Sequence, residues 1–583
     1  MNVHYSLEEN TLILISLLKK HKISKIIVSP GSTNIAFAAS VQQDDFFELY
    51  SCVDERSAAY MACGLSAESN EPVVISCTGA TASRNYMPGL TEAFYRGLPI
   101  LAVTSSQPIE RIGHNIPQVL DRTVVPNDVV KNSVKIPFIY NEEQRWATRV
   151  KINDALLALT HNGKGPVHIE LTTLYTPDFS VKSLPEYKMI NKYSSIDDFP
   201  SIKSDKVAIF IGAHIKLSNE LTREIEIFCE KYNGVVLCDH TSNYWGKYRV
   251  LPNILCSQKG YTAKCRNIPL LIHIGEMSGA YLSIYPSQVW RIHEDGKLKD
   301  TYKKLTCVFE TTELNFFRNY NANNSNSNNI SYYNVWRNEC DDILLKVPDL
   351  PFSNAWIAQN TSGSLPTNSV IHFGILNSLR SWNYFELPNN TMGYCNTGGF
   401  GIDGGVSSLV GASLFDKNKL YFGVFGDLLF FYDMNSIGNR HISNNVRILV
   451  VNNGKGNEFR NYGNWASQLG DYADDYIAAA GHFGNKSKSL IKDLSLNLGF
   501  DYISASNKNE YISNLNVFVS EKISEKPIVF EVFTETEEES KALELIYNIR
   551  KTAASYIKES TKSFLGDKGT DKFKKMYKSL KGE

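Results

Sequence analysis

Short apolar runs recur along the whole chain, each bounded by polar or glycine residues. A run of about four to eight apolar residues between turn residues is typical of a buried strand in a parallel sheet. Such runs predict strands at residues 25–28, 47–53, 73–76, 100–104, 207–211, 234–238, 270–275, 289–292, 370–374, 420–425, 446–451 and 528–532. Segments with a helical pattern, such as 11–21 and 217–232, lie between them. Strands that alternate with helices predict an α/β fold built from doubly wound parallel sheets.

The chain of 583 residues is too long for one hydrophobic core, and about three domains are expected. The grouping of the strands places these domains at residues 1–184, 200–345 and 360–540. A Lys-rich extension, 541–583, is predicted to be helical, either as a solvated helix or as a packing arm. The polar run 321–329, NANNSNSNN, predicts a loose loop.

Composition excludes several classes of protein. The formal net charge of −1 argues against nucleic acid or an anionic membrane as a partner. No apolar run approaches the roughly 20 residues of a membrane span, and the polar, partly acidic N-terminus is unlike a signal peptide. The ten cysteines include no CxxC pair, so we expect a reduced cytoplasmic chain without a zinc site.

Two polar turns follow apolar runs in the last third of the chain. Gly426-Asp427-Leu428-Leu429 follows the first run, and Asn452-Asn453-Gly454-Lys455-Gly456 follows the second. Open α/β sheets bind ligands at the carboxyl ends of their strands. Asp427 and Asn453 offer a carboxylate and an amide oxygen, which are ligands that suit Mg²⁺. The two turns therefore predict a magnesium site, whereas the structural alternative is a strand turn with a capping Asp.

This pair of turns resembles the motif of the thiamine-diphosphate-dependent decarboxylase and carboligase superfamily. With Leu428 in third place, it is similar to the version in the SEPHCHC synthase family of the menaquinone pathway. The resemblance implies that Asp427 and Asn453 bind Mg²⁺ through their side chains and Lys455 through its backbone carbonyl. It also implies that Gly426, Asp427 and Leu428 lie at the cofactor diphosphate, where helix-start amides suit an anion.

The first domain carries further motifs of this superfamily in the same order. Ser29-Pro30-Gly31-Ser32 is followed by Asp54-Glu55-Arg56 and by a Gly/Thr/Ser turn at 77–83. The resemblance implies that Glu55 is catalytic and hydrogen-bonds the cofactor aminopyrimidine. A carboxylate does this best in a dry pocket, where one hydrogen bond is stronger than in water. The structural alternative is a Glu that complements a helix dipole.

Residues 111–118, RIGHNIPQ, resemble a loop of the acetohydroxyacid synthases, in which a Gln points at cofactor and substrate. The resemblance assigns Gln118 to that role, with a solvated loop residue as the alternative. His114 and Asn115 are candidate proton donors to the reacting carbonyl.

The last domain adds two matches, and the middle domain adds none. Asn377-Ser378 resembles a pair near the diphosphate in the SEPHCHC synthase family. Ile402 stands where the superfamily has an aliphatic wedge that bends the cofactor, and a buried core Ile is the alternative. The middle domain looks Rossmann-like but has no GxGxxG after its strands, which favours a structural role.

Together these motifs imply a pyrimidine-binding domain, a central Rossmann-like domain and a diphosphate-binding domain. The cofactors implied are thiamine diphosphate and Mg²⁺. The activity implied is that of a transferase or lyase that decarboxylates a 2-oxo acid. The resulting acyl-anion equivalent is then transferred to an aldehyde or ketone acceptor. The superfamily also implies a homodimer or homotetramer with small-molecule substrates.

Three arginines of the SEPHCHC synthase family are replaced here by Thr33, Gln107 and Thr397. Each lost charge-assisted bond would cost roughly 1.5–3 kcal/mol of substrate binding. We therefore expect a less charged acceptor than isochorismate, with Arg84 and Arg460 as candidates to restore charge. Three alternatives stay open: a simple 2-oxo acid decarboxylase, a true SEPHCHC synthase, and an inactive cofactor-binding scaffold.

Overall fold

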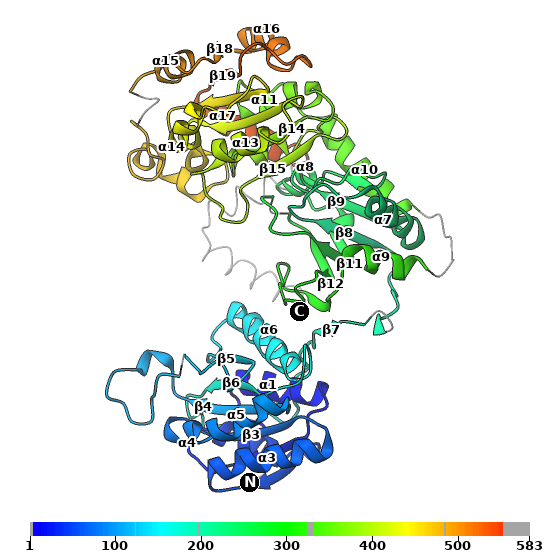
Figure 1. Ribbon diagram of the computed structural model, residues 1–583, viewed down its shortest axis with the longest axis vertical. Coiled ribbons are helices and arrows are strands. Elements are labelled where there is room, and N and C mark those ends of the chain that lie inside the picture. The colour runs from blue at the N-terminus through cyan, green and yellow to red at the C-terminus, as the bar shows by residue number, and fades with distance from the viewer. Residues whose placement is uncertain are drawn as a thin grey trace, which may run out of the picture. The chain divides into compact units, whose positions relative to one another are not determined.

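The protein is described by a computed structural model that covers residues 4–122, 124–195, 198–280, 282–322, 330–482 and 486–551. The chain divides into two compact units, one of residues 1–195 and 295–310 and the other of residues 196–294 and 311–583 (Figure 1). The strands form sheets of six, seven and six strands. Every described pairing between them is parallel, which confirms the predicted α/β class.

The first unit holds a six-stranded sheet with the order β2-β1-β3-β4-β6-β5. Its elements are α1 (Glu9–Lys20), β1 (Lys25–Val28), α2 (Ile35–Gln42), β2 (Glu48–Ser51), α3 (Glu55–Ser69), β3 (Val73–Thr78), α4 (Ala80–Asn85), α5 (Met87–Arg96), β4 (Ile100–Ser106), η1 (Ile109–Arg111), β5 (Asn132–Ile136), α6 (Glu142–Ala158), β6 (Val167–Thr172) and the pair β7 (Asn191–Tyr193) and β13 (Leu305–Phe309).

The first part of the second unit contains the strands β10, β9, β8, β11 and β12, in that order. Its elements are β8 (Val207–Ile211), α7 (Asn219–Tyr232), β9 (Gly234–Cys238), β10 (Arg249–Val250), α8 (Asn253–Cys256), η3 (Lys264–Arg266), β11 (Asn267–Ile274), β12 (Tyr285–Ile292), α9 (Glu313–Asn321) and α10 (Ser331–Leu344).

The last part of the second unit holds a six-stranded sheet with the order β15-β14-β16-β17-β19-β18. Its elements are α11 (Asn354–Thr361), η4 (Ser362–Ser364), β14 (Val370–Phe373), α12 (Asn377–Trp382), β15 (Met392–Cys395), α13 (Gly405–Ser413), β16 (Tyr421–Gly426), α14 (Asp427–Tyr432), η5 (Met434–Gly438), β17 (Val446–Asn452), η6 (Asn457–Arg460), η7 (Trp465–Ala473), α15 (Leu490–Asn497), β18 (Asp501–Ala505), α16 (Lys508–Phe518), β19 (Ile528–Phe533) and α17 (Thr536–Tyr547).

The first and last sheets share one topology. Numbered along the chain, the strands of each sheet run 2-1-3-4-6-5. In the last sheet the connections after β14 and β16 leave in opposite directions, which makes the gap between these neighbours a topological switch point. Ligands of open α/β sheets bind at such a point, outside the carboxyl ends of the strands. The topology therefore places Asn377 and Asp427 on the two sides of one crevice.

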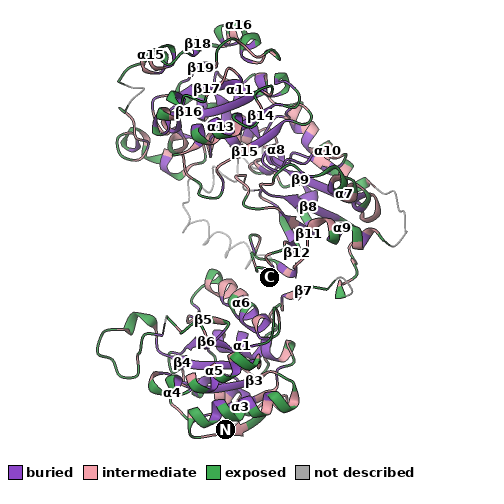
Figure 2. Cartoon of the chain, viewed as in Figure 1, coloured by how far each residue is buried: buried purple, intermediate pink, exposed green. Residues whose placement is uncertain are grey.

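Apolar runs predicted the strands that are buried on both faces (Figure 2). All seven residues of β17 are buried, as are all seven of β4. The pattern missed β6, which is equally buried but contains His168 and Glu170. It also missed the half-exposed strands β5 and β18, which lack a continuous apolar run.

Two predicted segments fall largely outside the described residues. These are 323–329 of the polar loop and 552–583 of the extension. Residues 541–547 of the extension form the end of α17. No helix within the described ranges is long and apolar enough to cross a membrane.

Candidate functional site

Asp427 and Asn453 come together at the carboxyl edge of the last sheet. Gly426 at the end of β16 pairs with Val451 on β17, so the turns that follow are neighbours. The Asp427 side chain is buried, and its Oδ2 accepts a 2.8 Å hydrogen bond from the Gly454 backbone N–H. The side-chain oxygen of Asn453 is buried and has no hydrogen-bond partner among the described residues. Two oxygen ligands, one of them without a partner, are thus held beside each other.

This pair fits a hard cation such as Mg²⁺. Burial raises the pKa of Asp427 to about 7, because the charged carboxylate lies away from water with no basic side chain to balance it. A bound divalent cation would supply that balance. Within the described ranges no three His, Cys, Asp or Glu side chains gather at a metal site. The remaining ligands would therefore be backbone carbonyls, water or the phosphates of a cofactor.

Lys455 turns its side chain away from this pair. Its ammonium pairs with Asp474 at 2.8 Å, and Asp474 also pairs with Arg460. The Gly456 backbone N–H donates to the Ala478 carbonyl at 2.6 Å, which fixes the turn. A side chain at Gly456 would crowd Ala478 and Leu428, so Leu428 packs close to this backbone. The prediction that Lys455 acts through its carbonyl is compatible with this geometry and stays a prediction.

Asn377 and Ser378 begin helix α12 on the other side of the switch point. The preceding Leu376 has φ 69° and ψ −113°, a conformation that non-glycine residues rarely adopt. Such strained positions persist only where the surroundings hold them, and they cluster at functional sites. The Asn377 side-chain oxygen accepts a 3.2 Å bond from Asn461, and the Ser378 hydroxyl accepts a 3.4 Å bond from Asn354.

Glu539 on α17 supports the start of α12 through Asn354, which hydrogen-bonds both Glu539 and Ser378. It is buried, and one carboxylate oxygen accepts from the Asn354 backbone N–H at 2.9 Å and from the Thr534 hydroxyl at 2.8 Å. Burial without a nearby cation raises the pKa of Glu539 to about 7. Sequence reasoning missed Glu539, Asn354 and Asn461, since nothing in the local pattern marks residues that support a loop so far along the chain.

Ile402 and Gly426 occupy the same edge. Ile402 is half-buried and packs against the apolar cluster beneath the sheet. The preceding Phe400 is a further non-glycine residue with positive φ, 56°. Gly426 caps α14, and a Cβ placed on it would meet nothing within 4 Å. The roles of both residues toward a cofactor stay predictions.

In the first unit Glu55 is the first residue of α3. Asp54 caps this helix by accepting a 2.9 Å bond from the Ser57 backbone N–H, so Glu55 need not cap it. Glu55 is half-exposed, and its charge adds to the rise in the pKa of Tyr86, for which burial is the main cause. A position in the first helical turn also suits the dipole alternative, so the catalytic assignment stays a prediction.

The loop 111–118 presents its polar side chains to solvent. His114, Asn115 and Gln118 are exposed, and both Asn115 and Gln118 have positive φ, 55° and 61°. Ser32 donates a 3.4 Å hydrogen bond to the Gln118 side chain, which brings Gln118 to the turn that follows β1. No described contact does the same for His114.

The residues that replace the family arginines are tightly bonded. Buried Thr33 donates to the Ser105 carbonyl at 2.7 Å and accepts from the Gly79 N–H at 3.1 Å. The Gln107 side chain accepts from Arg111 at 2.6 Å and donates to the Pro117 carbonyl at 3.2 Å. Thr397 is likewise buried. These positions therefore serve the fold and offer no positive charge.

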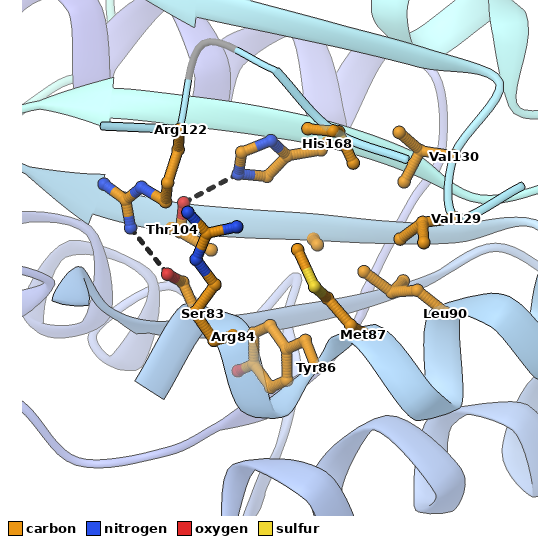
Figure 3. A pocket seen from close by; sticks show the side chains of 12 residues that line it. Ser83, Arg84, Tyr86, Met87, Leu90, Thr104, Arg122, Val129, Val130 and His168 are labelled. Atoms are coloured by element: carbon orange, nitrogen blue, oxygen red, sulfur yellow. Dashed lines mark hydrogen bonds between the residues drawn. The ribbon is translucent and has the colours of Figure 1, made fainter. Parts of the chain in front are cut away.

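Two arginines of the first unit line a small cavity (Figure 3). Arg122 is buried, pairs with Glu170 at 2.8 Å and donates to the Ser83 hydroxyl at 2.7 Å. Arg84 donates to the Asp121 carbonyl at 2.9 Å. The cavity measures about 30 Å³, which is room for about one water molecule. Its arginines hold the fold, and the cavity is too small for a substrate.

The chain is similar to known proteins along most of its length. Residues 11–124 match a family model described as "Thiamine pyrophosphate enzyme, N-terminal TPP binding domain". Over 571 residues the chain is 29% identical to the 2-succinyl-5-enolpyruvyl-6-hydroxy-3-cyclohexene-1-carboxylate synthase of Bacteroides thetaiotaomicron, which covers 93% of this chain and 99% of the relative. The synthases of the same name from Phocaeicola vulgatus and Flavobacterium psychrophilum are 29% and 26% identical, covering 93% and 90% of this chain.

Proposed function

We propose that this chain, which resembles these synthases along nearly its whole length and carries a thiamine-diphosphate-binding domain, is itself a SEPHCHC synthase-type carboligase. The proposal rests above all on that end-to-end similarity. The similarity favours SEPHCHC synthesis, which was one of the alternatives, over the first expectation of a carboligase with a neutral acceptor. The cytoplasm is the compartment that we expect.

The residues of the last sheet would hold the cofactor and its metal. Asp427 and Asn453 would bind Mg²⁺ through their side chains, with the Lys455 carbonyl as a further ligand. Asn377 and Ser378 would contact the diphosphate. Thiamine diphosphate supplies the electron sink that makes decarboxylation possible. The buried Asp427 favours this assignment, since a carboxylate in a dry site interacts strongly with a cation.

The name of the relatives indicates the class of donor. A succinyl group has four carbons, so its 2-oxo acid precursor is a five-carbon diacid that loses carbon dioxide. The acceptor would be isochorismate. Glu55 would hold the proton that the cofactor exchanges, and Gln118 and His114 would orient or protonate the reacting carbonyl.

A second candidate, an acceptor without negative charge, is favoured by one specific observation. Thr33, Gln107 and Thr397 are neutral and buried, and the side chains of Thr33 and Gln107 are hydrogen-bonded to their neighbours. Arg460 does not restore the lost charge, because Asp471 and Asp474 neutralise it. A neutral aldehyde, ketone or keto-sugar would suit such a pocket.

The active unit would be at least a homodimer. In the resembling family Glu55 and Asp427 of one catalytic centre come from different chains, and here they lie in different units. Large apolar side chains are exposed in both units: Val53 and Tyr60 on either side of Glu55 in the sequence, and Tyr472 and Tyr476 on either side of Asp474, the partner of Lys455. Exposed apolar groups beside a candidate site are what a partner chain would cover.

The test is to follow carbon dioxide release and product formation by the holoenzyme with a panel of 2-oxo acids. Each acid is supplied alone, with isochorismate, and with neutral aldehydes. SEPHCHC synthesis predicts the largest kcat/KM for the pair of 2-oxoglutarate and isochorismate. Release without any acceptor would identify a simple decarboxylase. No turnover under any condition, with cofactor bound, would identify an inactive scaffold.

A further inference from the structure

A cavity of about 500 Å³ borders the cofactor residues of the second unit, a size within the range of small-molecule sites. Its wall is rich in aromatic and basic side chains: Lys259, Arg380, Phe459, Tyr462, Trp465 and Tyr547. Asn461, a further wall residue, donates the 3.2 Å hydrogen bond to the Asn377 side chain described above. The cavity thus adjoins a residue assigned to the diphosphate.

Lys259 provides the net charge of this cavity. Its ammonium lies 3.9 Å from the ring centroid of Tyr462 and 5.6 Å from that of Tyr547. Among the residues that the structure describes, no carboxylate forms an ion pair with it. The other cation, Arg380, forms a bidentate ion pair with Glu458 at 2.7 and 2.8 Å, which neutralises the charge of Arg380. One half-buried positive charge therefore has aromatic faces around it but no counter-ion.

The position of Lys259 is fixed by the backbone. Its N–H donates to the Tyr547 carbonyl at 2.7 Å, and the preceding Gln258 side chain donates to the Ile546 carbonyl at 2.8 Å. These bonds attach the segment to the end of α17. Because the backbone is held in advance, only the Lys259 side chain would have to be ordered when a ligand binds.

We propose that this cavity binds a ring-bearing organic carboxylate, with the carboxylate on Lys259 and the ring against Tyr462 and Trp465. Aromatic walls favour a ring, because they bury its faces with little loss of side-chain entropy. An ammonium that lacks a counter-ion favours an anion.

The role of this ligand rests on the proposed function. In a SEPHCHC synthase-type reaction the acceptor is a ring that carries a carboxylate. Lys259 would then supply the positive charge that is absent at Thr33, Gln107 and Thr397, and it would select the acceptor. The similarity to the synthases and the loss of three arginines would thereby be reconciled.

The binding test uses benzoate as the probe and the holoenzyme loaded with thiamine diphosphate and Mg²⁺. Tryptophan fluorescence follows binding, since Trp465 lines the cavity. Benzamide, which has the same ring without the charge, is the ligand control. Lys259→Met should weaken benzoate binding about tenfold or more, whereas Lys259→Arg should retain most of it. Wild-type affinity in Lys259→Met, or equal affinity for benzamide, would overturn the proposal.

Lys247→Met is the matched control variant. Lys247 also lies over a tyrosine, 5.0 Å from the ring of Tyr248, but it pairs with Glu230 at 3.2 Å and lies outside this cavity. Its loss should leave benzoate binding unchanged. Thermal midpoints of all variants are measured alongside, and Lys259→Gln replaces Lys259→Met if the latter unfolds.

Kinetics separate this site from the proposed function. With 2-oxoglutarate and isochorismate, Lys259→Met should raise KM for isochorismate about tenfold while kcat changes little. An unchanged KM would overturn the acceptor role of Lys259. If benzoate binding needs Lys259 but no ring carboxylate stimulates turnover, the proposed function fails while the binding site stands.

Discussion

The first and last sheets share one strand order but hold their polar edges in different ways. At the edge of the last sheet Asp427 is buried and the oxygen of Asn453 has no partner, while the neighbouring turns are bonded to each other. At the edge of the first sheet Glu55 is half-exposed, and His114, Asn115 and Gln118 are exposed. The polar residues at the edge of the last sheet are thus largely buried within their own unit, whereas those at the edge of the first sheet are partly or fully exposed.

Under the proposed function, the two edges would divide the tasks of catalysis between them. A metal and a diphosphate need ligands whose geometry is fixed before binding, because reordering them would weaken affinity. A carboxylate that hydrogen-bonds the aminopyrimidine, as proposed for Glu55, needs only a defined position when the cofactor is bound. We therefore expect changes at the last sheet to alter cofactor binding and changes at the first sheet to alter turnover.

The largest effect is expected for Asp427→Ala. Losing the buried carboxylate should abolish both turnover and the rise in thermal midpoint that thiamine diphosphate and Mg²⁺ together produce in the wild type. Differential scanning fluorimetry with cofactor and metal, singly and combined, measures this. An unchanged cofactor affinity in the variant would disprove the metal assignment and weaken the contrast between the two edges.

Glu55→Gln should separate turnover from binding. Turnover is expected to fall by a factor on the order of 10²–10⁴, as for the loss of an acid–base group. The rise in thermal midpoint with cofactor and Mg²⁺ should be largely kept, because the last sheet is intact. A variant that retains full activity would leave Glu55 as a partner of the helix dipole.

Mixing two inactive variants tests whether Glu55 of one chain and Asp427 of another form one catalytic site. Glu55→Ala and Asp427→Ala chains that exchange subunits form hybrids in about half of the dimers, each with one intact site of two, so about a quarter of wild-type activity should return. Steady-state rates before and after subunit exchange measure this. An inactive mixture with demonstrated exchange would contradict a site shared between chains.

A smaller effect is expected for two buried carboxylates in different surroundings, Glu170 in β6 and Glu539 in α17. Burial alone would raise the pKa of Glu170 in β6, but the charges of Arg122 at 2.8 Å and Lys135 at 3.5 Å, together with hydrogen bonds to the carboxylate, outweigh burial and lower it. Glu539 has no such cation, and burial raises its pKa to about 7. The charge of Glu170 therefore stabilises the fold above the unfolded pKa, and this contribution is lost as pH falls through the folded pKa.

Replacing Glu539 or Glu170 by glutamine should therefore change the stability of the fold with pH in opposite ways. Glu539→Gln removes a group whose ionisation opposes folding, so relative to wild type it should gain stability as pH rises from about 4.5 to about 7. Glu170→Gln should be destabilised at neutral pH and less so in acid. Urea unfolding at several pH values measures both. Parallel pH profiles would show that the environments of the two carboxylates are alike.

The sequence predicted well what is local and apolar. Strands such as β8 and β9 stand at their predicted residues because both faces are buried and every position is apolar or small. The turns at Asp427 and Asn453 follow such strands, so their proximity was predictable from the rule for parallel sheets. β6 was missed because His168 and Glu170 interrupt its pattern, although buried partners satisfy both.

The residues that support the candidate site could not be predicted from the sequence. Glu539 reaches Asn354 across 185 positions, and Asn461 reaches Asn377 across 84. Such polar contacts depend on how helices pack, and neither partner carries a local pattern that marks it. The conformation of Leu376 was equally hidden, since leucine has no preference for a positive φ.

The repeated strand order 2-1-3-4-6-5 points to an evolutionary origin of the two sheets. Two copies of one topology in one chain are what duplication of an ancestral segment would leave, followed by divergence of the copies. A single ancestral crevice would have had to bind and to react with the same residues. Under the proposed function, duplication would have allowed one copy to specialise in holding an ion and the other in catalysis.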